Sequence, residues 1–194
     1  MGADSLVKFA VRPDGRIITH EPTLTLQYDK WAEEMQTLSV PGEHLPRYAI
    51  KRLTKCGGAR GHKFEVYSTT DKVQRIACIK QQSMPPRIQI NLTQADYKLK
   101  IKTHDSSRQY DAAGGLGRLY WKSTSTKACW KLKNNKGLVL LVTIDESKTN
   151  GIISIYKKHL ENEVIEELLA VAVAQIEDYN RITRASERSA GRAP

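Results

Sequence analysis

The sequence predicts a mainly β protein, a closed antiparallel barrel of about twelve strands around a buried hydrophobic C-terminal helix. Three observations lead to this fold class. Between residues 46 and 158, short segments rich in β-branched and aromatic residues alternate with turn sequences. No helical crossover separates these segments, so neighbouring strands are expected to pair antiparallel. Near the C-terminus, the run from Leu168 to Ala174 contains no polar residue, although it covers every side of a helix.

The first 45 residues are expected to contribute to the same barrel. Three short segments are typical of strands: LVKFAVRP, RIITHEP and LTLQYD. The next segment, DKWAEEMQTL, is predicted to be a short helix with Asp29 as its N-cap. Pro41 and Pro46 mark a loop, but the composition does not shift there, so a chain of 194 residues is expected to form one domain.

The strands of residues 46–158 are bounded by turn sequences rich in Gly, Asn, Asp and Pro. In DYKLKIKT, Tyr97, Leu99 and Ile101 are expected on the core side of a half-buried strand. In LVLLVTID, residues 138–142 do not alternate, so that strand is expected to be covered on both faces. The predicted strands are RYAIKRLT, HKFEVYST, VQRIACIK, RIQINL, DYKLKIKT, GRLYWKST, KACWKLK, LVLLVTID and IISIYKK.

The C-terminal helix is predicted to begin near Asn162 and to end near Tyr179 to Arg181, so that residues 46–182 contain the barrel strands and the helix. A helix is about 10 to 12 Å wide with its side chains, too wide for an eight-stranded barrel. A can of about eleven or twelve strands could hold it. Residues 183–194 are basic and poor in apolar side chains, and are expected to be a disordered tail.

The order of elements in CWKLKNNKGLVLLVTIDESKTNGIISIYKKHLENEVIEELLAVAVAQIEDYNR resembles the tubby C-terminal-like superfamily over about residues 60–182. That superfamily includes tubby, the LURP-one-related proteins and phospholipid scramblases, and the likeness is closest to its small fungal members. The resemblance implies a twelve-stranded barrel around a central hydrophobic helix. It also implies action at membranes, since tubby binds phosphoinositide headgroups through basic residues. No residue here matches those basic residues position by position, and the scramblase calcium-binding stretch has no counterpart.

The formal net charge of +10 predicts an anionic partner. We expect a phosphoinositide or an acidic membrane surface, bound by lysines that recur at strand period two on one face. The alternative is that these lysines form a solvated face that protects sheet edges. The candidate anion-binding residues are Lys98, Lys100, Lys102, Lys131 and Lys133.

Two other functions stay open. Tyr120, Trp121 and Trp130 are interleaved with basic residues, as in a stacking platform for nucleic acid. However, Trp121 with Leu119, and Trp130 with Leu132, fall at strand period, which favours core positions. A small-molecule site or an enzyme at the barrel mouth is the second alternative.

No catalytic residue, metal site or cofactor is predicted, and a binding protein is favoured over an enzyme. The histidines and cysteines lack metal-ligand spacing, and GGLG at 114–117 precedes a strand, as a turn does. Cys56, Cys78 and Cys129 are in no paired motif, which favours reduced thiols. With no apolar run long enough to span a bilayer, we expect an intracellular protein, cytoplasmic or nuclear, that could associate with a membrane peripherally.

Overall fold

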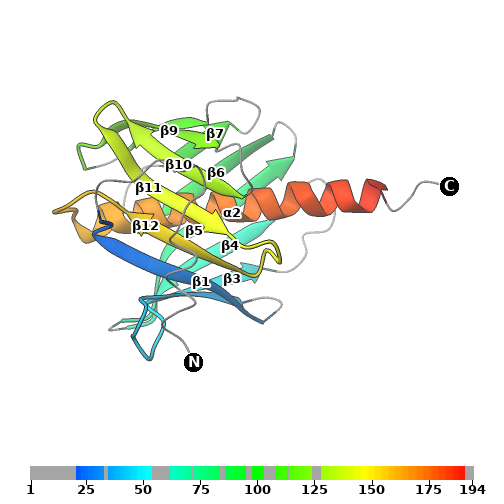
Figure 1. The fold of residues 1–194 in the computed structure, drawn as a ribbon, viewed down its shortest axis with the longest axis horizontal. Coiled ribbons are helices and arrows are strands. Elements are labelled where there is room, and N and C mark those ends of the chain that lie inside the picture. Colours follow the sequence, from blue (N-terminus) through cyan, green and yellow to red (C-terminus); the bar gives the residue numbers. More distant parts are fainter. Residues whose placement is uncertain are drawn as a thin grey trace.

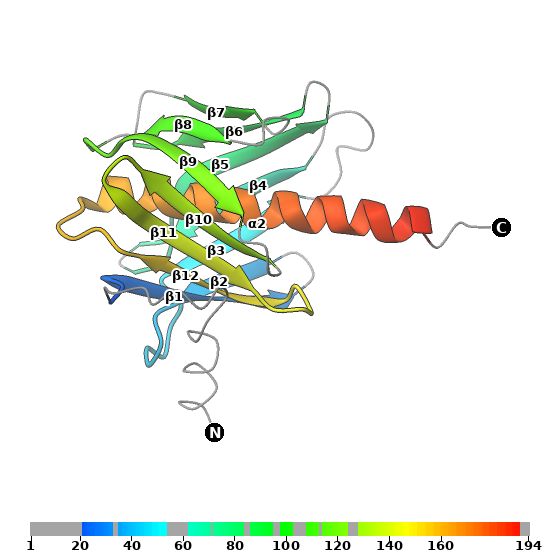
Figure 2. The same ribbon diagram turned by 45° about the horizontal axis from the view of Figure 1, so that its top comes forward.

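The computed structural model describes residues 21–32, 35–53, 62–70, 72–83, 86–94, 98–102, 108–112, 114–123 and 128–190. One twelve-stranded sheet curls around a C-terminal helix (Figures 1 and 2). The predicted mainly β fold is therefore confirmed. The strands are β1 Leu24–Ala32, β2 Met35–Ser39, β3 Tyr48–Leu53, β4 Lys63–Ser68, β5 Gln74–Ser83, β6 Pro86–Leu92, β7 Lys98–Lys102, β8 Gln109–Ala112, β9 Gly117–Ser123, β10 Cys129–Asn134, β11 Gly137–Ile144 and β12 Asn150–Ile155.

The strand order is β7-β6-β5-β4-β3-β2-β1-β12-β11-β10-β9-β8, and every pair is antiparallel. The first and last strands meet in the middle of the sheet, where Leu26 of β1 lies opposite Ile153 of β12. The two edges are β7 and β8, which follow one another in the chain. Within the residues described, no hydrogen-bonded ladder joins these two edge strands, so the barrel is nearly closed. The gap between β7 and β8 is called the seam.

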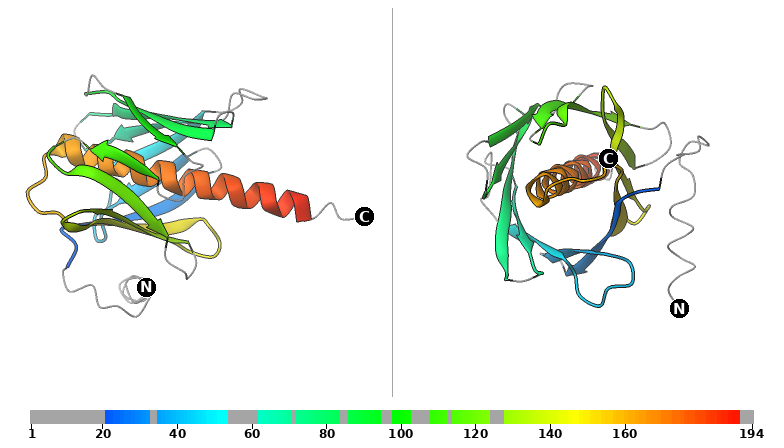
Figure 3. Two further views of the ribbon diagram at one scale, coloured as in Figure 1. Left: turned by 90° about the horizontal axis from the view of Figure 1, so that it is seen from above. Right: turned by 90° about the vertical axis from the view of Figure 1, so that its left-hand side faces the viewer.

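The helix α2, Asn162–Ala190, runs through the middle of the barrel, as the end-on view of Figure 3 shows. Every residue from Leu168 to Ala174 is at most 1% exposed. The apolar run therefore needs no polar side because the sheet surrounds it. At the start of the helix, Gly114 lies so close to Val164 that an added Cβ would overlap the Val164 side chain.

The helix continues to Ala190, so the predicted end near Tyr179 to Arg181 is too early, and the predicted disordered tail is helical as far as Ala190. The physical reason is that Arg, Ala, Ser and Glu sustain a helix without a core to pack on. The next glycine in the sequence is Gly191, where a helix commonly stops. Residues 191–194 lie outside the described part of the chain.

The predicted short helix in DKWAEEMQTL is wrong, because this segment spans the end of β1 and most of β2. Leu26, Tyr28 and Leu38 are buried at strand period and pair across neighbouring strands, which outweighs the helix propensity of Ala and Glu. Asp29 accepts a hydrogen bond from Gln27 Nε2 at 3.0 Å instead of capping a helix. The strand expected in LTLQYD is confirmed as β1, whereas LVKFAVRP and all but the last two residues of RIITHEP lie outside the described residues.

The predicted strands from residue 46 onward correspond to β3 to β7 and β9 to β12. In β11, the four consecutive residues Val139 to Val142 are all buried, as the absence of alternation predicted. The sequence did not predict β8, which has only four residues.

Candidate anion-binding site

The alternation of β7 places its lysines on the outside of the barrel. Leu99 and Ile101 are 4% and 2% exposed and belong to the core, whereas Lys98 and Lys100 are exposed. Lys102 ends the same strand, but its side chain is outside the described set. Three of the predicted site residues thus share one edge strand, and two have a defined outward side chain.

The strands next to β7 extend this basic face. Across the sheet, Lys100 is paired with Gln89, Gln89 with Lys80, and Lys80 with Lys63, so lysines recur along one outward row from β7 to β4. The parallel row through Lys98 ends at Glu65 on β4. The outer surface of β4 to β7 therefore carries an excess of positive charge.

Glu65 is locally neutralised. Its carboxylate accepts hydrogen bonds from Tyr67 Oη at 2.7 Å, from Lys63 Nζ at 3.2 Å and from Arg75 Nη1 at 3.1 Å. The Tyr67 hydrogen bond, followed by the contacts with Lys63 and Arg75, lowers the pKa of Glu65 although partial burial opposes this. The carboxylate therefore stays ionised and held by its own neighbours, and does not cancel the charge of Lys98 and Lys100.

The lysines predicted on β10 lie on the other side of the seam. Lys131 is paired with Lys122 of β9, and Lys133 is paired with Tyr120, which in turn lies opposite Gln109 of β8. Both β10 lysines are half-buried. They are two strands away from the seam, so the five predicted lysines form two groups on the barrel surface, one on each side of it.

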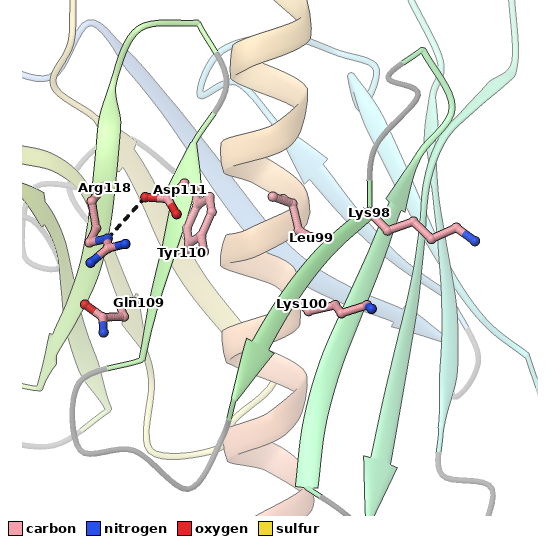
Figure 4. A pocket seen from close by; sticks show the side chains of 7 residues that line it. All are labelled: Lys98, Leu99, Lys100, Gln109, Tyr110, Asp111 and Arg118. Carbon is pink, nitrogen blue, oxygen red and sulfur yellow. Dashed lines mark hydrogen bonds and ion pairs between the residues drawn. The ribbon is translucent and has the colours of Figure 1, made fainter.

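A pocket of about 320 Å³ lies at the seam between β7 and β8 (Figure 4). Leu99 and Tyr110, both buried, point toward α2, while Lys98 and Lys100 extend along the outer side. Arg118 of β9 makes an ion pair with Asp111 at 3.1 Å. The pocket thus has an apolar floor and a polar, mainly basic rim, and its lining residues are Lys98, Leu99, Lys100, Gln109, Tyr110, Asp111 and Arg118.

Of the three aromatic residues in the predicted stacking platform for nucleic acid, Tyr120 is half-buried, and the two tryptophans are not at the surface. Trp121 and Trp130 are 5% and 8% exposed and belong to the core, as their strand period indicated. The Trp130 ring packs edge-on against Tyr179 of the helix, with 4.9 Å between ring centroids. Both indole faces are therefore engaged inside the barrel and cannot stack on bases.

A second charged cluster, which the sequence did not predict, surrounds the helix near its exit from the barrel. Glu177 accepts hydrogen bonds from Tyr28 Oη at 3.1 Å and Arg52 Nη2 at 2.9 Å. Asp178 lies 2.9 Å from both Arg108 and Arg181. Burial, and then the charge of Glu177 and its hydrogen bond, raise the pKa of Tyr28 far above its ordinary value. In the sequence, the only indication of this cluster was a pair of acidic residues, Glu177 and Asp178, on a helix that is otherwise largely apolar.

The structure also places the glycines and cysteines for which no binding or catalytic role was predicted. Gly114, Gly115 and Gly117 of GGLG have positive φ angles, so this segment is a turn. Cys78 and Cys129 are buried free thiols, whereas Cys56 lies outside the described residues. Among the side chains that the structure defines, no His, Cys, Asp and Glu residues gather as a set of metal ligands. The same part of the chain contains no helix long and apolar enough to cross a membrane.

Comparisons with known proteins give no relative from which a site could be transferred. The resemblance to the tubby C-terminal-like superfamily therefore stays a prediction. The chain matches no protein-family model, no curated protein and no solved structure.

Proposed function

We propose that this protein binds anionic membrane surfaces, with phosphorylated lipid headgroups held at the seam between β7 and β8. The observation that carries the proposal is the pocket of about 320 Å³ whose rim includes Lys98, Lys100 and Arg118. Ammonium and guanidinium groups bind phosphate oxygens through charge-assisted hydrogen bonds. The single carboxylate in the lining, Asp111, is already paired with Arg118.

The pocket floor favours a lipid over a purely ionic ligand. Leu99 and Tyr110 lie directly under the basic rim and are 4% and 5% exposed. A headgroup that projects from a bilayer carries apolar ring or chain carbons beside its phosphate, so the phosphate would meet the lysines while these carbons meet the floor. A single strand of nucleic acid that stacked its bases on the protein would need exposed aromatic side chains, and Trp121 and Trp130 are in the core.

The proposed role agrees with the resemblance of the C-terminal segment to the tubby C-terminal-like superfamily, because tubby binds phosphoinositide headgroups. Membership of that superfamily, a phosphoinositide as the ligand and an intracellular, peripheral membrane location all belong to this proposal. The role needs no catalytic group, so the protein would act as a binding protein. No residue role is transferred from tubby to this chain.

The size of the electrostatic contribution can be worked out. A basic side chain near an anionic membrane contributes about 1 kcal/mol to binding. Removing the charges of Lys98 and Lys100 should therefore weaken binding by about 2 kcal/mol, which corresponds to about thirtyfold in Kd. Both side chains are exposed, so their replacement by Gln should not alter the melting temperature.

The test is a vesicle flotation assay with the Lys98→Gln/Lys100→Gln protein. Vesicles of phosphatidylcholine alone, with phosphatidylserine, or with a phosphoinositide are compared at low and physiological salt. The matched control is Lys136→Gln/Lys158→Gln, which removes the same charge from exposed positions outside the seam. We expect headgroup-selective binding that the seam variant loses and the control keeps. Equal binding by the two variants would contradict the proposed site, and retention on nucleic acid without vesicle binding would favour that alternative.

A further inference from the structure

Positive charge also gathers at the barrel mouth where α2 leaves the sheet. Three arginines contact two buried carboxylates there, and a fourth, Arg184, follows on the same helix, which leaves an excess of positive charge. Glu177 and Asp178 have side chains that are 0% and 1% exposed, so they lie beneath the arginines. The arginines are Arg52 of β3, Arg108 ahead of β8, and Arg181 and Arg184 of α2.

Arg52 is held rigidly and has donor capacity to spare. Its guanidinium lies over the Phe64 ring, 5.3 Å from the centroid, and its Nη2 donates to Glu177 at 2.9 Å. Its Nε is buried and has no hydrogen-bond partner in the described structure. A guanidinium carries five N–H donors, so a further acceptor that approached the exposed part of the side chain would bind Nη donors that do not bind Glu177.

His62 lies beside the same aromatic ring, with 6.4 Å between its centroid and that of Phe64. Burial first, and then the positive charges of Arg52, Arg181 and Arg184, lower the pKa of the imidazole, and only Glu177 acts in the opposite direction. Glu177, which binds Arg52, lies four residues before Arg181 and seven before Arg184, so the three positions share one face of the helix α2. The four residues Arg52, His62, Arg181 and Arg184 are referred to as the mouth cluster.

Solvent can reach the mouth cluster. The side chains of Arg52 and Arg181 are 21% and 30% exposed, and Arg184 and His62 are exposed. An incoming anion would therefore meet guanidinium groups at the surface while the carboxylates stay below. The planar donor fork of arginine matches the oxygens of a phosphate group.

We propose that the mouth cluster binds a phosphate-type oxyanion, supplied either by a free phosphate compound or by a lipid headgroup. Arg52 is the fixed donor, Arg181 and Arg184 supply charge from the helix, and His62 adds a donor when it is protonated. This site is separate from the basic rim of the β7–β8 seam and does not depend on the function proposed for that seam. Binding of a phosphorylated ligand would reduce the excess of positive charge at the point where α2 leaves the barrel.

The experiment measures the pKa of His62 by NMR during titration with inorganic phosphate. The His62→Gln variant identifies the imidazole resonance. A bound anion offsets the charge of the arginines, so phosphate should raise the pKa of His62 and shift its resonance with saturation. Arg184→Gln should weaken this response about tenfold, the equivalent of one charge-assisted hydrogen bond. The control is Lys158→Gln, which also removes one exposed positive charge but lies before the helix begins. It should leave the response of His62 to phosphate unchanged.

Two further measurements distinguish a lipid headgroup from free phosphate, and the mouth cluster from the site at the seam. Vesicles containing phosphatidic acid, compared with inorganic phosphate, show whether a lipid headgroup is needed to shift His62. The Lys98→Gln/Lys100→Gln protein should keep the phosphate response of His62 even where it has lost vesicle binding. The proposal is overturned if neither probe shifts His62, or if Arg184→Gln and Lys158→Gln respond equally.

Discussion

Replacing Glu177 with Gln tests how the helix is fixed to the barrel wall. The wild-type carboxylate is 0% exposed, and its two oxygens accept from Tyr28 at 3.1 Å and from Arg52 at 2.9 Å. Gln has nearly the same shape, but it has one acceptor oxygen and no charge. If its amide NH₂ faced Arg52, a donor would lie against a donor; if it faced Tyr28, the hydroxyl could accept, but the charge-assisted bond to Arg52 would still be replaced by a neutral one.

The expected loss follows from the burial of the two partners. Removing one partner of a fully buried ion pair costs about 3 to 5 kcal/mol. Arg52 is 21% exposed and keeps some hydration, so the lower end, about 3 kcal/mol, applies to Glu177→Gln. For a chain of this size, 1 kcal/mol changes the melting temperature by about 2 to 4 °C, so we expect a decrease of about 6 to 12 °C.

Thermal and urea unfolding followed by circular dichroism measure this change. The control is Arg52→Gln together with the double variant Arg52→Gln/Glu177→Gln. Because the two residues are in contact, the double variant should lose less stability than the sum of the single variants. A Glu177→Gln protein within about 0.5 kcal/mol of wild type, or strict additivity in the cycle, would refute the reasoning.

Two further predictions concern the helix start and acid stability. Gly114→Ala should lower the free energy of unfolding by about 1 to 3 kcal/mol more than Gly115→Ala does. Both glycines have positive φ, but only a Cβ at Gly114 would overlap Val164. Equal losses in urea unfolding would contradict this close packing. The pKa of Glu65 is lowered in the folded state, so its stabilising contribution is present above its ordinary value of 4.5 and is lost as pH falls below it. Glu65→Gln should therefore flatten the decrease in melting temperature on acidification, and an unchanged acid slope would show that the contacts with Tyr67 do not matter for stability.

Most of the fold could be predicted because burial leaves a period in the sequence. Leu99 and Ile101 alternate with lysines and are buried, and the unbroken apolar run from Leu168 to Ala174 is enclosed on every side. Neither pattern requires knowledge of which strands are neighbours. Local patterning was therefore sufficient for β3 to β7, for β9 to β12 and for the enclosed part of the helix.

Residues 29–38, which span the end of β1 and most of β2, could not be predicted in the same way. They include strong helix formers, and β1 is paired with β12, far away in the chain. The four-residue strand β8 has one buried apolar side chain, Tyr110, and so shows no period. These two errors have one cause, because tertiary pairing decides what local propensity leaves ambiguous.

Only part of the candidate site was visible in the sequence. Lys98 and Lys100 were predicted from their spacing, but their position at an open seam depends on which two strands fail to pair. The charged cluster at the helix exit was missed because Arg52 and Glu177, which form an ion pair in it, are 125 residues apart. Ion pairs across such separations leave no local pattern, and an acid on an apolar helix is the only trace.

The helix α2 passes through the barrel, so that its apolar run from Leu168 to Ala174 is enclosed and its last turns are exposed. Val171 is 1% exposed and Ile182 is 47% exposed on the same helix, so Val171→Asp and Ile182→Asp make the same change inside and outside the barrel. An unpaired charge in the core should prevent Val171→Asp from folding, whereas Ile182→Asp should melt near the wild-type temperature. A soluble Val171→Asp protein with a melting temperature like that of Ile182→Asp would contradict the account.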